Sequence, residues 1–195
     1  MIKDELSEGV MFIPTLEVNI EMSPIEFEKY AIEILKAQIK GLENIKVIHN
    51  KIIEVEDGNY QIDGYIEFEI MGVKYKTIIE CKHYKTSITR EKVQVLYEKI
   101  RACGVNKGIL ISTSNFQSGA IKFASIHGIA LIQLTESGPE YQTRSRLNVI
   151  MNSPRTPYVE GAKYIGVMQT NFGSGITCSY LTDTNLSLGE FLRMN

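Results

Sequence analysis

Three side chains of this chain have the types needed for phosphodiester chemistry: Asp63, Glu80 and Lys82. Two carboxylates can hold a hard cation such as Mg²⁺, which keeps most of its own waters. Such a cation lowers the pKa of a bound water and offsets the charge of a phosphate. A lysine beside the carboxylates can orient the attacking water and stabilise developing negative charge. The backbone carbonyl of Cys81 is available as a further oxygen ligand, so these residues predict a metal-dependent nuclease site.

A β-hairpin over residues 60–84 is the element that must bring the three side chains together. Polar and apolar residues alternate from Ile62 to Ile70, the pattern of a strand with one apolar face. A second alternating run begins at Val73, after Met71-Gly72. Met-Gly is not the preferred dipeptide of a tight hairpin turn, which favours Asn-Gly or Asp-Gly.

The position of the turn decides which residues face each other. With the turn centred on Met71-Gly72, two pairs of opposite charge fall opposite each other, which stabilises an antiparallel pair. The same alignment places Asp63 opposite Glu80, with Lys82 two residues further along the same face. A slip of one residue would turn Asp63 to the other face, and the charge pairs argue against that slip. These pairs are Glu67 with Lys76 and Glu69 with Lys74.

The segments around the hairpin predict a mixed α/β sheet flanked by helices. Ser23 and Glu26 form a capping box around Pro24, which marks the start of a helix. Short links between the later elements imply parallel crossovers. The expected order is therefore α-β-β-β-α-β-α-β, an antiparallel meander joined to parallel strands. The other expected elements are strands at 45–53, 108–112 and 129–134 and helices at 90–103 and 117–127.

The two ends of the chain differ from this central part. Residues 1–22 are expected to form an N-terminal arm, followed by a domain over residues 23–135. Residues 136–195 are rich in Ser, Thr, Asn, Gly and Pro and predict a β-rich extension with strands at 158–171 and 176–181. The extension could add an edge to the sheet, form a dimer interface or cover the site.

Composition and charge limit the class of protein. The chain has 195 residues, of which 44% are hydrophobic and 23% charged, and it contains no apolar run that approaches the ~20 residues of a membrane span. Its three scattered cysteines and the absence of a signal-peptide pattern favour the reducing cytoplasm, with no membrane association. The net charge of −2 hides a basic block over residues 74–107. Such a block is either a solvated helix face or a phosphate-binding surface, and its place beside the carboxylates favours the second.

In order and motif, the chain resembles the PD-(D/E)xK nuclease core, and more narrowly the Mrr-like restriction endonuclease catalytic domain. Each motif is short, but their joint order over residues 23–135 is specific. The matching segments are Ser23–Glu28, Gln61–Gly64 (QIDG), Ile79–Tyr84 (IECKHY) and Lys107–Leu131, which contains GILIST and GIAL.

The resemblance implies a role for each candidate residue. Asp63 and Glu80 would bind Mg²⁺, for which Mn²⁺ would substitute, and Lys82 would be the catalytic lysine. Glu28 would be either an additional acid or a solvated helix residue, and Gln94 matches a glutamine of the following helix. The expected phosphate contacts, which position a nucleic acid without specifying its sequence, are Lys85, Arg90 and Lys92.

The implied function is a metal-dependent endonuclease that hydrolyses DNA, of the restriction or defence type. Two alternatives stay open: a junction-resolving nuclease that acts as a homodimer, and a nuclease-like module that binds without catalysis. The chain shows no evident helix-turn-helix segment of the kind that restriction enzymes of this family carry for recognition. Sequence or methylation preference is therefore not predicted.

Overall fold

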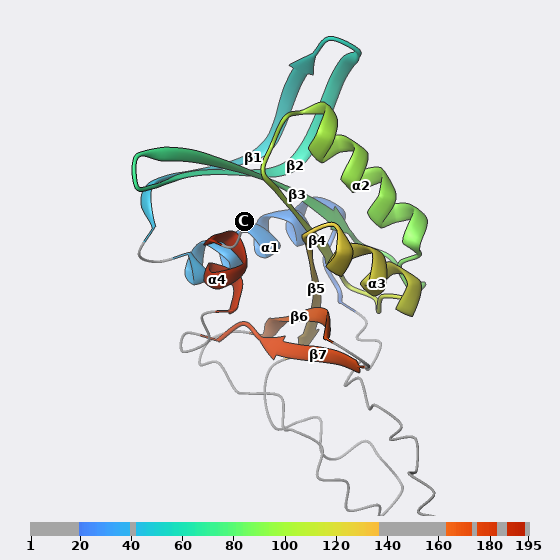
Figure 1. Cartoon of the computed structure of the whole chain (residues 1–195). Helices are drawn as coiled ribbons and strands as arrows, with labels where there is room; N and C mark the ends of the chain where they lie inside the picture. The colour runs from blue at the N-terminus through green and yellow to red at the C-terminus, as the bar shows by residue number, and fades with distance from the viewer. Residues whose placement is uncertain (1–19, 40–41, 137–162, 173–174, 183–186, 194–195) are drawn as a thin grey trace, which may run out of the picture.

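The computed structural model describes residues 20–39, 42–136, 163–172, 175–182 and 187–193 (Figure 1). Seven strands form one sheet in which spatial order follows chain order, from β1 to β7. The pairs β1–β2, β2–β3, β5–β6 and β6–β7 are antiparallel, whereas β3–β4 and β4–β5 are parallel. The elements are α1 (Pro24–Gln38), β1 (Glu43–Val55), β2 (Gly58–Ile70), β3 (Val73–Lys82), α2 (Arg90–Ala102), β4 (Lys107–Ser112), α3 (Ser118–Ile126), β5 (Ile129–Glu136), β6 (Tyr164–Phe172), β7 (Gly175–Tyr180) and α4 (Ser187–Arg193).

The element order confirms the expected mixed α/β arrangement and adds to it. β6 pairs with β5 and β7 pairs with β6, so these two strands extend the central sheet, which is one of the three roles left open for this region. The short helix α4 was not predicted. The expected arm falls mostly on residues 1–19, and the start of the expected strand on residues 158–162; both lie outside the described residues. In the described part of the chain, no helix is both long and apolar enough to span a membrane.

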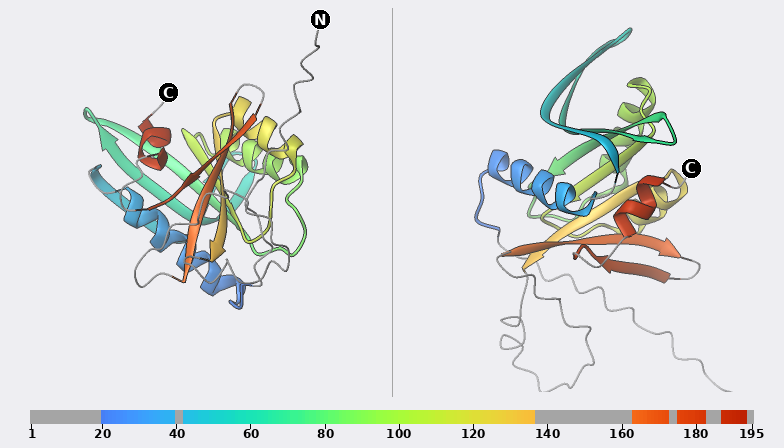
Figure 2. Two further views of the ribbon diagram at one scale, coloured as in Figure 1. Left: turned by 90° about the horizontal axis from the view of Figure 1, so that it is seen from below. Right: turned by 90° about the vertical axis from the view of Figure 1, so that its left-hand side faces the viewer.

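Helices cover both faces of the sheet (Figure 2). α1 and α4 pack on one face, where Phe27 and Leu35 meet Leu188 and Leu192 in a shared apolar cluster. α2 and α3 pack on the other face in a second cluster. Neighbouring residues of β4 alternate between the two, because successive side chains of a strand point to opposite faces. The second cluster includes Val93, Leu96, Leu110, Ile121 and Leu131.

The predicted capping box at the start of α1 is confirmed. Ser23 Oγ accepts a hydrogen bond from the Glu26 backbone N–H at 3.3 Å, and the Glu26 carboxylate accepts one from the Ser23 N–H at 2.8 Å. Both bonds satisfy N–H groups that the first turn of a helix leaves without partners. The helix thereby starts at a fixed residue, and its buried side chains Phe27, Ala31 and Leu35 face the sheet.

The predicted register of the β2–β3 hairpin is also confirmed. The ladder runs from Ile70–Val73 at the turn to Gly64–Ile79, with Glu67 opposite Lys76. Met71 and Gly72 both have positive φ, 52° and 76°, as a type I′ turn requires. The facing charges do not close ion pairs, however. Glu67 instead accepts from the Tyr65 hydroxyl at 2.9 Å, and Glu69 accepts from the Asn44 amide at 2.5 Å.

The regular β2–β3 ladder ends at Gly64, the neighbour of Asp63 in the chain. Asn50 of β1 has a positive φ of 51°, and the β1–β2 register passes from His49–Gly64 to Lys51–Ile62 without an Asn50–Asp63 pair. Ile62 packs in the α2–α3 cluster, although Ile66, four residues along the strand, packs in the α1–α4 cluster. The single apolar face predicted from Ile62 to Ile70 is therefore wrong at Ile62, because alternation breaks at the irregularity.

Candidate active site

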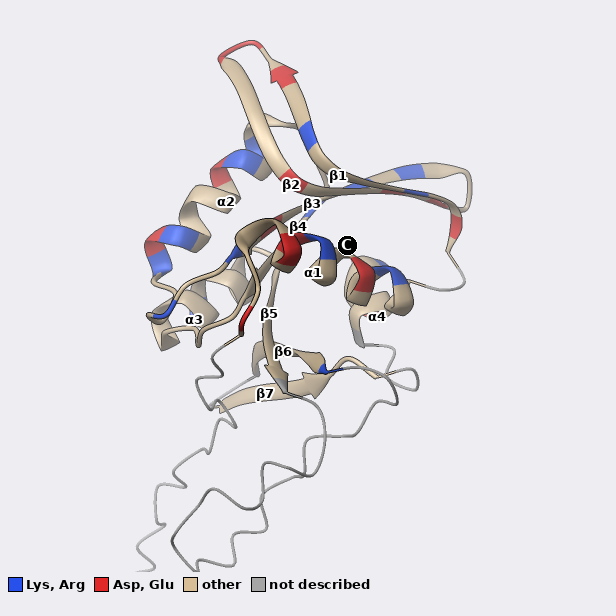
Figure 3. Ribbon diagram, turned by 180° about the vertical axis from the view of Figure 1, so that it is seen from behind, with Lys and Arg blue, Asp and Glu red and all other residues tan. Residues whose placement is uncertain are grey.

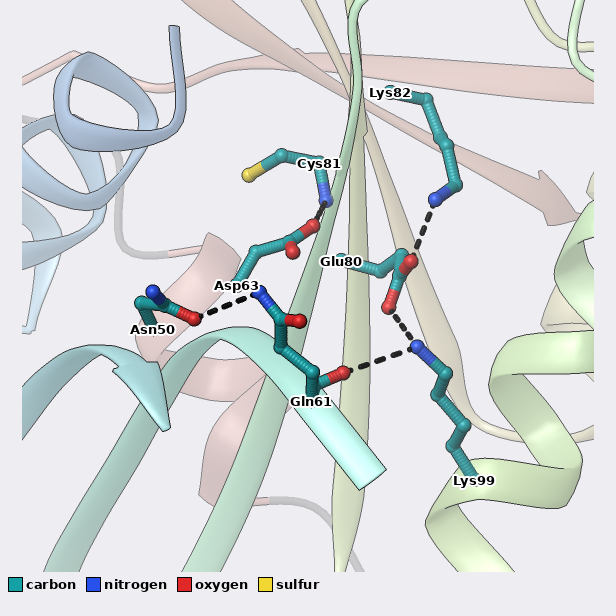
Figure 4. Close-up of polar contacts among 7 residues, drawn as sticks. All are labelled: Asn50, Gln61, Asp63, Glu80, Cys81, Lys82 and Lys99. Atoms are coloured by element: carbon teal, nitrogen blue, oxygen red, sulfur yellow. Dashed lines mark hydrogen bonds and ion pairs between the residues drawn. The ribbon is translucent and has the colours of Figure 1, made fainter. Parts of the chain in front are cut away.

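Glu80 of β3 is the centre of a buried charged cluster (Figure 4). Glu80 is 8% exposed. Each of its two carboxylate oxygens accepts a hydrogen bond from a lysine ammonium group. Lys82 Nζ donates to Oε1 at 2.5 Å, and Lys99 Nζ of α2 donates to Oε2 at 2.8 Å. Lys99 Nζ also donates to the main-chain oxygen of Gln61 at 3.3 Å. A buried carboxylate needs such partners, since an uncompensated buried charge is strongly destabilising.

Asp63 lies where the β2–β3 ladder ends. Its Oδ2 accepts a hydrogen bond from the Cys81 backbone N–H at 2.7 Å. Burial raises the pKa of Asp63, the Cys81 hydrogen bond lowers it, and the charges of Glu80 and Glu28 raise it further; the net direction is upward. The site therefore holds two carboxylates in different states: Glu80 is compensated by two lysines, whereas Asp63 is oriented by a backbone amide beside like charges.

Lys82 remains a cation in this setting. Burial lowers its pKa, but the hydrogen bond to Glu80 and the charges of Glu80 and Asp63 outweigh burial, so the pKa lies above its usual value. Lys82 can therefore donate hydrogen bonds to a developing negative charge without first gaining a proton.

The end of β3 is fixed by the turn between β4 and α3. The Thr113 backbone N–H donates to the Lys82 carbonyl at 3.2 Å, and the Thr113 hydroxyl donates to the Tyr84 carbonyl at 2.8 Å. Ser114 Oγ donates to the Thr86 carbonyl at 2.7 Å. These bonds hold the segment that follows Lys82 and thereby fix the position of the strand end that carries the lysine.

The hairpin thus brings Asp63, Glu80 and Lys82 into mutual electrostatic range, as the register predicted. Asp63 and Glu80 are not a ladder pair, however, because the ladder ends at Gly64–Ile79. Asn50 of the neighbouring strand β1 has a positive φ at this level of the sheet. The Asp63 carboxylate accepts a hydrogen bond from the backbone N–H of Cys81.

Glu28 and Gln94 occupy different places relative to this cluster. Glu28 of α1 pairs with His49 Nε2 of β1 at 2.9 Å, and its charge contributes to the raised pKa of Asp63. It therefore borders the site. Gln94 is exposed on α2, and the residue of that helix that reaches Glu80 is Lys99.

The expected phosphate contacts lie around the start of α2. Lys85 and Arg90 are exposed and Lys92 is partly exposed; the Arg90 guanidinium lies 5.1 Å from the Phe123 ring centre. Lys92 Nζ is 3.9 Å from the Glu91 carboxylate. Charges of both signs lie along α2, and acidic residues mark the tip of the β1–β2 hairpin (Figure 3). The basic block of the sequence is therefore interrupted on the surface and not a continuous positive stripe.

Lys99 is the residue of the cluster that sequence reasoning missed. It lies three residues after Leu96 and next to Ile100, both of which pack against the sheet. Helical spacing places it at the border of the inward face, from where a long side chain can reach a strand. That position was the available signal, but the residue on the sheet that it meets depends on how α2 packs.

The donor set of the cluster fits a hard cation. Asp63 and Glu80 offer carboxylate oxygens, and oxygen ligands suit Mg²⁺ and Mn²⁺. A cation there would also offset the like charge that raises the pKa of Asp63. Within the described ranges, no group of three or more His, Cys, Asp or Glu side chains could hold a metal ion. Two carboxylates agree with Mg²⁺, which keeps several waters in protein sites.

Comparison with known proteins gives a family and a curated relative. The family model Mrr_cat, described as Restriction endonuclease, matches residues 20–136. The type IV methyl-directed restriction enzyme EcoKMrr of Escherichia coli strain K12 is 27% identical over 118 residues, which cover 60% of this chain and 37% of that enzyme. The match thus spans little more than a third of the length of this relative.

Two solved structures are also similar to the chain. A protein of unknown function, AF1548, has a TM-score of 0.44 and 19% identity, and the match covers 55% of each chain. The DNA modification-dependent restriction endonuclease AspBHI has a TM-score of 0.40 and 18% identity, and the match covers 56% of this chain and 28% of that one.

Proposed function

The chain belongs to the Mrr_cat family of restriction endonucleases, and from this premise we propose that it is a metal-dependent endonuclease that hydrolyses DNA phosphodiester bonds in restriction or defence. The observation that carries the proposal is the buried Glu80 carboxylate, bound by Lys82 and Lys99 beside an Asp63 whose pKa is raised. Charged groups are costly to bury. Their concentration at the end of one hairpin favours chemistry over a purely structural role.

Each residue of the cluster has a part in the proposed reaction. Asp63 and Glu80 would hold Mg²⁺ or Mn²⁺, with the Cys81 carbonyl as a further oxygen donor. When bound, the cation supplies a more acidic water and offsets phosphate charge. The Cys81 N–H orients Asp63, and Glu80 orients the Lys82 ammonium. Lys82 then donates hydrogen bonds to the charge that develops on the phosphate.

DNA is the proposed partner, with Lys85, Arg90 and Lys92 as candidate phosphate contacts at the start of α2. The name of the relative EcoKMrr describes a methyl-directed restriction enzyme. Modified DNA is therefore one of the substrates to compare. The junction-resolving alternative would use the same site as a homodimer, and only the choice of substrate separates it from restriction. A module that binds without catalysis has no need of a buried carboxylate flanked by two ammonium groups.

Cleavage of supercoiled plasmid by the full chain tests the proposal. We expect nicking or cutting with Mg²⁺ or Mn²⁺ and none with EDTA. Glu80→Ala and Lys82→Ala should each lower the rate by about 10²-fold or more, since preorganised electrostatic groups contribute on that scale. Glu67→Ala, at the other end of the hairpin, is the matched control and should cleave as the wild type does. Undiminished cleavage by Glu80→Ala or Lys82→Ala would overturn the site assignment.

Substrate comparison separates the remaining alternatives. Methylated plasmid, unmethylated plasmid and a four-way junction, at equal concentrations, would show which class of DNA is cleaved fastest. A preference for the junction over both plasmids would replace restriction with junction resolution as the proposed role. Tight DNA binding without cleavage of any substrate would support the non-catalytic module.

A further inference from the structure

Lys99 joins the charged cluster from a different element than the other members. Asp63, Glu80 and Lys82 all lie on the β2–β3 hairpin, whereas Lys99 extends from α2. Its Nζ lies 2.8 Å from Glu80 Oε2, and its side chain is 20% exposed. The oxygen that Lys99 occupies is one that Glu80 would offer to a cation.

We propose that Lys99 is a positioning residue that holds Glu80 in the cation-free protein and competes with a divalent cation for this carboxylate. The proposal rests on the proposed function, because the cation is the one that Asp63 and Glu80 would hold. Lys99 supplies the positive charge that a buried carboxylate requires. A bound cation supplies that charge in its place, so Lys99 and the cation are alternative partners of Glu80.

The contacts of the two lysines indicate which one gives way. Lys99 Nζ has a second acceptor, the Gln61 main-chain oxygen at 3.3 Å, and it keeps this partner when it leaves Glu80. Lys82 shares the strand of Glu80 and contacts it at 2.5 Å. Release of Lys99 therefore costs less than release of Lys82.

The helix that carries Lys99 stays in place during this exchange. A Cβ at Gly108 of β4 would lie 2.4 Å from Ile100 Cδ1, which shows how closely α2 approaches the sheet. Leu96 and Ile100 are buried on either side of Lys99 in the chain. The exchange is thus a change in the side chain of Lys99, while the packing of Leu96 and Ile100 holds the helix in place.

A cation that binds Glu80 must first displace Lys99. The free energy of that displacement lowers the affinity for the cation. Removal of the Lys99 ammonium should therefore strengthen cation binding, even though Glu80 loses a neighbour. Coupling between sites commonly amounts to about 5- to 150-fold. We expect at least about 5-fold tighter Mn²⁺ binding in Lys99→Met.

Mn²⁺ binding to the full chain without DNA tests the proposal independently of activity. The free Mn²⁺ concentration is followed by electron paramagnetic resonance for the wild type and for Lys99→Met, Lys99→Arg, Arg101→Gln and Glu80→Gln. Arg101 is an exposed residue of the same helix, paired with Glu98, so Arg101→Gln removes the same charge without touching Glu80. Tighter binding is expected in Lys99→Met alone, while Lys99→Arg retains the ion pair and stays close to the wild type.

The outcomes separate this inference from the proposed function. If Glu80→Gln weakens Mn²⁺ binding but Lys99→Met binds no tighter than Arg101→Gln, the competition is overturned and the metal site stands. If Glu80→Gln leaves the affinity unchanged, the cation does not bind at Glu80 and both proposals fall. Lys99→Gln, with the same expected direction, replaces Lys99→Met if the latter does not fold.

Discussion

The two ends of the β2–β3 hairpin use the same residue types in opposite ways. Near the turn, Glu67 faces Lys76 across the strands, and neither closes an ion pair with the other. At the far end, Glu80 is buried and bonded to two ammonium groups. Exposed charges select a register at little cost, because water screens them. A buried charge needs a partner of opposite charge close to it. For Glu80 one such partner, Lys99, lies on α2, so the charge constrains how α2 packs.

The largest expected difference between the two ends is in stability. Glu80→Ala should lower the free energy of unfolding by about 2–4 kcal/mol in EDTA, because it leaves two partly buried ammonium groups without their shared partner. Glu67→Ala should cost less than about 1 kcal/mol. Urea denaturation of the two variants measures both values. Equal losses would show that burial does not distinguish the two ends.

The next effect concerns the close contact beside Asp63. A Cβ at Gly64 would lie 2.9 Å from Ile79 Cδ1 and 3.1 Å from Ile79 Cβ. Gly64→Ala should therefore cost about 1–3 kcal/mol, as overpacking of a core does. Ile79→Val removes the nearest atom, so it should cost less in the Gly64→Ala background than in the wild type. Simple additivity in urea denaturation would contradict the clash.

Asp63→Asn should stabilise the protein by about 0.5–1 kcal/mol in EDTA while abolishing cleavage. The asparagine oxygen can still accept from the Cys81 N–H, and the charge beside Glu80 is gone; partial exposure of Asp63 keeps the gain small. Glu67→Gln is the control. The Tyr65 hydroxyl and nearby lysines lower the pKa of Glu67, so its neutral form should bring no gain. A lower melting temperature for Asp63→Asn than for the wild type would refute the expectation.

The smallest effect is expected at the turn. Met71 is 97% exposed with a φ of 52°, a conformation that asparagine adopts more readily than other non-glycine residues. Met71→Asn should stabilise the protein by a few tenths to about 1 kcal/mol. Met71→Leu, which keeps the strain, should melt with the wild type. If Met71→Asn melts no higher than Met71→Leu, turn strain is not a factor.

The features that could be predicted from the sequence are those that follow from local patterns of residues. Facing charges at Glu67–Lys76 and Glu69–Lys74 located the turn, and the register followed to the residue. The Ser23–Glu26 capping box placed the start of α1. In each case the relevant partners lie within one helical turn or across one hairpin, so their spacing in the chain fixes their spacing in the fold.

The features that sequence reasoning missed depend on packing between distant elements. Lys99 meets Glu80 only because α2 crosses β3 at a particular rotation, which no local pattern encodes. The alternation near Asp63 breaks opposite Asn50, a residue of the partner strand with a positive φ, and no pattern within β2 itself marks this point. α4 is the exception, because the spacing of Leu188 and Leu192 by one helical turn was a local signal that the sequence offered.

The strand order of the sheet has a consequence for folding kinetics. Because β1 to β7 lie in chain order, each strand can be added beside one that is already in place. The longest stretches of chain between paired strands are residues 83–106, which include α2, and residues 137–163. The entropic cost of closing such a stretch grows only with the logarithm of its length, and sheets with local connections fold faster than those with remote ones. The hairpin bearing Glu80 should thus form early, and the docking of α2 should add Lys99 at a later step. Folding would then complete the charged cluster only when the helix packs.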